Sequence, residues 1–492
     1  MASPLVRTRA ILWTPFRQGQ GSGNAPSTWN AVSAQMWDAL ADLSPLSFTT
    51  NNPDGTNPTS TQGIAFVDDT SNMFNIPLDI AQPDQTGIAD SLTTFTRTWE
   101  GILHTNGGAL KAEKCFCYIV QWDYTGNFPK LLKRAQTHTN VTMVDSTTGL
   151  HHTLQQRGTH EAERTLGIRL CPSGNMMSEL TFLRNKARDF AKLLLRGRFT
   201  PRQISVAYSS YFLPSLTYSL PTTTFTQSQC NSIQRSTTTS FLLSMGFNRH
   251  FPRNVTFGPR EYGGLGFRDL YTEQGALKAA HIIGHLRKQS TLGKMYRNLI
   301  EMHQLTAGTS APILQDTATT LPHLTAGSIT SLRNFLNEAD CHLVLDFPRP
   351  PNPPREHDQY LMDAFLRLQL PNAKIKQLNA CRLYLQVTTL SDICDGHGSN
   401  ILKAAMLGTT ITTSTSSYQW PRQHRPTERA WMLWRTTIRR LWLNGRRFTM
   451  HPHHWLGEWN TSLSTPSAMA LCHQPPDWPT MGYHHPNQCK TV

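Results

Sequence analysis

Two adjacent carboxylates, Asp68 and Asp69, stand between two short runs of β-prone residues. Residues 63–67 come before the pair and residues 70–74 follow it, so the sequence predicts a β-hairpin with the acids at its turn. Neighbouring carboxylates repel each other, and a divalent cation removes that repulsion because hard cations favour carboxylate oxygens. Metal ions held in this way activate the attacking hydroxyl in nucleotidyl transfer and neutralise the leaving pyrophosphate. The plainer interpretation is a solvated Asp-Asp-Thr turn without a ligand.

The segments around this hairpin predict a mixed α+β fold. Apolar residues at helical spacing predict helices over residues 27–43 and 84–104, on either side of the hairpin in the chain. Residues 115–122 are typical of a strand, and residues 167–170 of another. From about residue 176 the pattern becomes helical, and we expect further helices over 201–219, 227–246 and 272–288.

Net charge separates the same regions of the chain. The 492 residues carry a net charge of +14, but residues 1–150 contribute −3, residues 151–290 contribute +11 and residues 291–492 contribute +6. A strongly positive segment indicates a polyanionic partner. The cations gather early in the helical part, at Arg184, Lys186, Arg188, Lys192, Arg196 and Arg198. For any one of them, the alternative is a solvated helix face.

The setting of the Asp pair resembles the reverse transcriptases (RNA-directed DNA polymerases) of LINE-like non-LTR retroelements. The residues Phe66-Val67-Asp68-Asp69 resemble the family's aromatic-x-Asp-Asp motif. Residues 20–26 resemble its Gln-Gly-x-x-x-Ser-Pro loop, with Ala25 in place of the serine. Residues 107–115 resemble its Gly-x-x-Leu-Asn-x-x-Lys element, with Lys111 in place of the asparagine. Leu166-Gly167 resembles its primer-gripping strand, and residues 257–266 resemble the Gly-Gly-Leu-Gly segment that follows its thumb.

The resemblance implies a role for each matched residue. Asp68 would bind the catalytic magnesium ion, Asp69 would support it, and Lys114 would lie near the pyrophosphate. The nucleotide and template site would include Gln20, Gly21, Gly23 and Phe66. The basic residues Arg184, Lys186, Arg188, Lys192 and Arg196 would contact the duplex. The implied partners are an RNA template, a DNA primer and, in the complete enzyme, a deoxynucleoside triphosphate.

The implied architecture is α+β. Residues 1–175 would form a partial polymerase palm, an antiparallel sheet with helices on one side. Residues 176–290 would form a thumb-like helical region, and residues 291–492 a mostly helical region of unknown role.

One part of the family's pattern is not found. The family has another metal-binding aspartate on a strand several tens of residues before the Gln-Gly loop, whereas nineteen residues precede Gln20 and none is acidic. Two-metal chemistry requires ligands on both strands. We therefore expect an N-terminally truncated fragment or relic of a retrotransposon nucleotidyltransferase, inactive as a polymerase by itself. The alternative is a non-catalytic nucleic-acid-binding protein on the same scaffold.

The last 200 residues contain a second concentration of positive charge. Residues 420–447 combine eight arginines with four tryptophans. Trp431, Trp434, Ile438 and Leu441 share one helical face, which predicts that they pack in a core. The cations Arg435, Arg439 and Arg440 form a hypothetical second nucleic-acid patch. The histidines and cysteines after residue 450 lack the paired spacing of a zinc site.

Cysteine content and hydropathy indicate the compartment. Nine cysteines, an odd number scattered along the chain, do not indicate a disulfide framework. No apolar run approaches the roughly 18 residues of a membrane span. We expect an intracellular protein, nuclear or cytoplasmic, without a membrane partner.

Overall fold

The structure is a computed structural model of the chain. It describes residues 25–66, 69–76, 86–123, 130–137, 139–145, 148–197, 199–348, 355–395, 400–409, 420, 424–443 and 456. The chain divides into two compact units. Unit 1 comprises residues 1–49, 60–121 and 132–161, and unit 2 comprises residues 50–59, 122–131 and 162–492.

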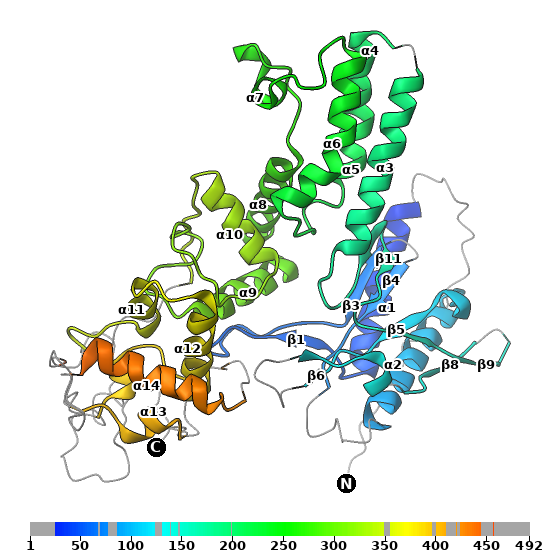
Figure 1. Cartoon of the computed structure of the whole chain (residues 1–492). Helices are drawn as coiled ribbons and strands as arrows, with labels where there is room; N and C mark the ends of the chain where they lie inside the picture. The colour runs from blue at the N-terminus through cyan, green and yellow to red at the C-terminus, as the bar shows by residue number, and fades with distance from the viewer. Residues whose placement is uncertain are drawn as a thin grey trace. The chain divides into compact units, whose positions relative to one another are not determined.

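Unit 1 combines two long helices with short strands (Figure 1). Its elements are α1 (Ala25–Leu43), β3 (Gly63–Phe66), β4 (Asp69–Asn72), α2 (Thr86–Thr105), η1 (Ala112–Lys114), β5 (Phe116–Tyr118), η2 (Arg134–Gln136), β8 (Thr142–Val144), β9 (His151–Thr153) and β10 (Gln155–Arg157). The strands form two-stranded pairs: β3 with β4 and β8 with β9 are antiparallel, whereas β5 and β10 are parallel. The pair of β1 (Phe48–Thr50) and β2 (Thr59–Thr61) leads into the loop that belongs to unit 2.

The core of unit 1 follows from the helical spacing of apolar residues. Met36 and Leu40 of α1 pack with Phe95, Trp99 and Ile102 of α2. A second cluster lies between α2 and the strands, where Val141, Met143 and Leu154 are buried. These are the helices expected from the sequence, and both begin and end within two residues of the predicted limits.

Unit 2 begins with two small antiparallel pairs and continues with a helical bundle. The strands are β6 (Trp122–Asp123) with β7 (Lys130–Leu131) and β11 (Glu163–Thr165) with β12 (Ile168–Leu170). The bundle elements are α3 (Met177–Arg196), α4 (Pro201–Val206), the π-helical stretch η3 (Ala207–Phe212), α5 (Leu213–Thr217), α6 (Gln227–Ser244), α7 (Arg253–Phe257), η4 (Arg260–Tyr262) and α8 (Leu270–Lys288). The expected helix 201–219 is thus interrupted by a wider turn, because Pro214 has no N–H to donate within the helix.

Local signals in the sequence set where the bundle helices begin. Thr200 and Thr226 each form a capping box, in which the hydroxyl accepts from the backbone N–H three residues on and the glutamine there bonds back. Leu183 and Leu194 of α3, Phe212 of η3 and Phe241 of α6 meet in the bundle core.

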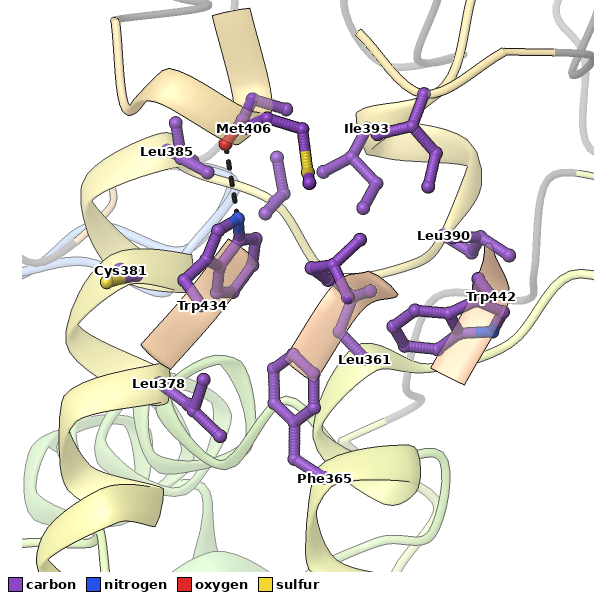
Figure 2. Packing of buried hydrophobic residues seen from close by; sticks show 14 of the residues in the cluster. Leu361, Phe365, Leu378, Cys381, Leu385, Leu390, Ile393, Met406, Trp434 and Trp442 are labelled. Carbon is purple, nitrogen blue, oxygen red and sulfur yellow. Dashed lines mark hydrogen bonds between the residues drawn. The ribbon is translucent and has the colours of Figure 1, made fainter. Parts of the chain in front are cut away.

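The rest of unit 2 is helical in its described part. Its elements are α9 (Thr291–Ala307), α10 (Ser328–Glu338), α11 (Leu361–Arg367), α12 (Asn372–Leu385), η5 (Ser391–Ile393), α13 (Lys403–Leu407) and α14 (Glu428–Trp442). The final core forms around α14, as Figure 2 shows, where Trp434 and Trp442 pack among Phe365, Leu378 and Met406. The indole N–H of Trp434 donates to the carbonyl oxygen of Ala405 at 3.1 Å. The predicted packing of the tryptophan face is therefore confirmed.

The expected α+β class is confirmed: among the described residues, the strands lie before residue 171 and helices dominate after it. The described strands form separate pairs, and a polymerase palm stays an expectation. No described helix is both long enough and apolar enough to span a membrane. The expected division at residues 175 and 290 stays a prediction.

Candidate nucleic-acid interface

The hairpin around the Asp pair forms where the sequence predicts it. In the antiparallel register Phe66 lies opposite Asp69, so Asp69, expected at the turn, begins the second strand. Asp68 lies outside the described residues, and Asp69 and Phe66 are described only by their backbone places in β4 and β3. Gln20, Gly21 and Gly23 also lie outside the described part of the chain, so their expected roles at the nucleotide stay predictions.

Close packing seats the hairpin on the two helices of unit 1. A Cβ atom on Gly63 would lie 2.5 Å from the Ser71 carbonyl oxygen and 2.6 Å from the Trp37 ring, so this strand position requires glycine. Trp37 of α1 in turn packs against Trp99 of α2, with ring centroids 4.8 Å apart. The side-chain amide of Gln62 donates to the Ser44 carbonyl oxygen at 2.9 Å, which ties the base of the hairpin to the end of α1.

Magnesium is the ion that the resemblance implies for Asp68 and Asp69. Hairpin turns can present carboxylate oxygens, the ligands that magnesium prefers. Within the described residues, however, no group of three or more His, Cys, Asp or Glu side chains is placed to hold a metal ion. The described residues therefore do not complete a metal site, and we derive no catalytic step through one.

Lys114 lies in unit 1 just before strand β5. It ends the short helix η1 and its side chain is exposed. The neighbouring Lys111 forms an exposed ion pair with Glu113 at 3.7 Å. Sequence reasoning missed Glu100, which is buried in α2 and raises the pKa of the Cys115 thiol, in addition to the larger effect of burial. The feature of the sequence that could have indicated it is its position directly after Trp99, a residue of the predicted apolar helix face.

In unit 2, Leu166-Gly167 forms the turn of the β11–β12 hairpin. Both residues have positive φ values, +50° and +87°, as in the tight turns that suit a two-residue hairpin. The Tyr218 hydroxyl donates to the Leu166 carbonyl oxygen at 2.9 Å. At the other end of the hairpin, the backbone N–H of Arg169 donates to the buried Glu179 carboxylate at 2.9 Å. The hairpin is therefore fixed to both the start of α3 and the residue after α5.

The five basic residues expected to contact a duplex divide into two groups. Arg184 donates to the Ser232 hydroxyl at 2.7 Å, and Lys186 donates to the Ser215 carbonyl oxygen at 2.8 Å. Burial lowers the pKa of Lys186, while Glu179 opposes the shift. These two half-buried side chains hold α3 against α6 and α5, so part of their hydrogen-bonding capacity is already used inside the bundle.

The other three cations lie on the exposed side of α3. Arg188, Lys192 and Arg196 are exposed and follow one another at intervals of four residues, which places them on one face of the helix. Lys192 contacts Asp189 at 3.1 Å, but both side chains are more than 60% exposed, so water and salt weaken this ion pair. We call these three residues the α3 cation row. Sequence reasoning missed the exposed Arg202 and Arg235 on α4 and α6, because each is isolated among uncharged residues.

Helix α14 also separates packing residues from exposed cations. Its tryptophans are buried, whereas Arg429, Arg439 and Arg440 are exposed. Arg435, one of the three arginines expected in the second patch, instead contacts Glu428 at 2.6 Å. The exposed face therefore includes only two of the three expected cations and adds Arg429.

Comparisons with protein-family models, with curated proteins and with solved structures found no match for this chain.

Proposed function

We propose that the chain belongs to a polymerase of the reverse-transcriptase type and binds a template–primer duplex through the α3 cation row. The observation that carries the proposal is the exposed row itself, on a bundle whose first helix also anchors the Leu166-Gly167 hairpin. The support from unit 1 is the antiparallel β3–β4 pair, which forms where the sequence predicts a hairpin around the Asp pair. The order of these features along the chain is the order that the resemblance implies.

The α3 cation row is better suited to bind phosphate than Arg184 and Lys186, the other two basic residues expected to contact the duplex. A cation that is exposed and only loosely paired can approach a phosphate and release a bound counterion. Arg184 and Lys186 would have to leave acceptors inside the bundle to do the same. The row residues Arg188, Lys192 and Arg196 should therefore account for most of the salt dependence contributed by α3.

The test removes the charges of the row and keeps a polar side chain at each of the three positions. The triple variant Arg188→Gln, Lys192→Gln, Arg196→Gln should bind an RNA–DNA duplex more weakly and should reduce the slope of log affinity against log salt by about 3. The measurement is fluorescence anisotropy of a labelled duplex at several salt concentrations. The matched control removes three exposed lysines from α12 and α13, at Lys374, Lys376 and Lys403. Equal slopes for the two triple variants would reject the row as the binding surface.

Duplex binding does not by itself imply polymerase activity. The alternative function is that of a non-catalytic nucleic-acid-binding protein on the same scaffold. Asp68 and Asp69 are adjacent in the chain, whereas two-metal transfer requires carboxylates from more than one strand. We expect the purified chain to show no robust magnesium-dependent primer extension while still binding duplex. Robust synthesis that is abolished by Asp68→Asn would establish the chain as a polymerase in its own right.

A further inference from the structure

A tyrosine at the tip of a closed loop in unit 2 has no role in the duplex-binding proposal. Tyr262 is 88% exposed, more than any other large apolar side chain in the described residues. It ends the short helix η4, in the loop between α6 and α8. Water contacts almost the whole ring, so the ring gains little from its position in the folded chain alone.

The backbone of this loop is held by a set of internal hydrogen bonds. Gly266 donates to the Gly258 carbonyl oxygen at 2.9 Å, and Leu265 and Phe267 donate to the carbonyl oxygens of Val255 and Thr256. A Cβ atom on Gly264 would lie only 2.1 Å from the Gly258 oxygen, so the two halves of the loop touch through backbone. Gly263, with φ of +80°, turns the chain directly after the tyrosine. The ring is therefore displayed from a backbone that is already ordered.

The loop is also anchored on the bundle. Phe257, Leu265 and Phe267 pack against or within the same core as α3 and α6. At the start of the loop, the rings of Phe247 and Phe251 have centroids 4.7 Å apart. Figure 1 shows α7, which forms one side of the loop, standing apart from α4 and α6. Because the loop is already anchored, binding a partner through its exposed ring requires little further loss of conformational entropy.

The charges of the loop indicate the chemistry of that partner. Arg249, Arg253 and Arg260 are exposed, and Glu261 is the exposed acid among them. The Arg260 Nε donates to the Leu265 carbonyl oxygen at 3.3 Å, within the loop itself. An exposed aromatic ring with exposed guanidinium groups in the same loop region of the chain suits a ligand that combines flat rings with phosphates.

We propose that Tyr262 stacks on an unpaired base of a single-stranded nucleic acid, with Arg253 contacting its phosphates. Unpaired bases expose the ring faces that a duplex hides, so this site selects single strands over duplex. Stacking does not depend on base identity, and the site is expected to be tolerant of sequence. This site shares no residue with the α3 cation row, and the two proposals can fail independently.

The experiment compares Tyr262 variants in binding labelled 15-mers of uridine and of deoxythymidine to the full chain. Tyr262→Ala should weaken binding about 10-fold, whereas Tyr262→Phe should stay within about twofold of the native chain. Tyr262→Leu keeps an apolar side chain but no ring, and it should resemble the alanine variant. Because an exposed side chain is changed, circular dichroism and melting should be unaffected.

Salt dependence separates the ring from the arginines. The Tyr262 variants should leave the slope of log affinity against log salt unchanged, and Arg253→Gln should reduce it by about 0.7. If Tyr262→Ala weakens binding of the uridine strand only, the site is assigned to single-stranded RNA. If it weakens binding of both strands equally, the site is assigned to single strands of RNA and DNA alike. Unchanged affinity of Tyr262→Ala, native affinity of Tyr262→Leu, or an equal loss of duplex binding would overturn the proposal. If duplex binding still depends on the α3 cation row in that case, only the Tyr262 proposal is rejected.

Discussion

Buried cations show how the positive charge of this chain is distributed between core and surface. Arg382 is fully buried and donates to the carbonyl oxygens of Leu305 at 2.8 Å and Thr306 at 2.7 Å. Arg333 similarly donates to the carbonyl oxygen of Ile313, at 3.0 Å. Such arginines satisfy backbone oxygens that water cannot reach. Part of the net charge of +14 therefore stabilises unit 2 and is not available to a polyanion.

A buried histidine makes the stability of unit 2 sensitive to pH. His323 is 8% exposed, and one ring nitrogen lies 3.0 Å from the Ala307 carbonyl oxygen. Burial lowers its pKa from 6.5 to about 4, and the nearby Arg382 and Arg333 add to the effect. Between these values the unfolded chain binds a proton that the folded chain does not. Stability from this residue is complete above pH 6.5 and is lost as the pH falls toward 4.

We expect His323→Gln, which keeps an N–H donor, to remove this dependence. Relative to the variant, the native chain should lose about 2 kcal/mol of unfolding free energy between pH 7 and pH 5. Urea denaturation of both proteins at each pH measures it. The comparison with the variant is essential, because burial and Asp392 raise the pKa of Asp358 to about 6, and this shift acts in the opposite direction. A constant difference between the two proteins across this range would contradict the assignment.

Helix α14 places packing and charge on different faces. Its buried face includes Trp431, Trp434 and Ile438, each 0% exposed, and its exposed face includes Arg439 and Arg440. The helix is thus both a structural element of the final core and a candidate binding surface. Substitutions on the two faces should have separable effects.

We expect Trp434→Ala to lower the unfolding free energy by about 3–5 kcal/mol, because it leaves a cavity and an unpaired Ala405 carbonyl. Arg439→Gln, on the exposed face of the same helix, should change it by less than about 0.5 kcal/mol. Chemical denaturation followed by tryptophan fluorescence and circular dichroism compares the two. Similar losses for both variants would show that the faces are not separated as described.

The two compact units are connected more than once along the chain. Residues 50–59 belong to unit 2, although the residues before and after them belong to unit 1. Asn298 of α9 holds this segment: its amide donates to the carbonyl oxygens of Asn57 at 3.0 Å and Thr50 at 3.2 Å. In return, its own oxygen accepts from the Asn57 amide at 2.9 Å. Because Asn298 is 1% exposed, losing these bonds would leave buried polar groups without partners.

We expect Asn298→Ala to release residues 50–59 and to speed cleavage by endoproteinase Asp-N at Asp54 several-fold. Asn298→Asp, which cannot donate to the two carbonyl oxygens, should have a similar effect. The control is Asn372→Ala, at an exposed position at the start of α12. Mass spectrometry of timed digests measures the rate, and equal rates for all variants would contradict the role of Asn298.

Helices α1, α2, α3, α6 and α8 and the β3–β4 hairpin follow from the sequence, because apolar spacing, capping residues and short β-prone runs act over a few residues. The tryptophan face of α14 follows for the same reason. Which cations remain free does not, because their partners are distant in the chain: Arg184 meets Ser232 across 48 residues, and Arg382 meets Leu305 across 77. The sequence therefore predicts a basic helix, and only tertiary packing separates Arg188, Lys192 and Arg196 from the cations that hold the fold together.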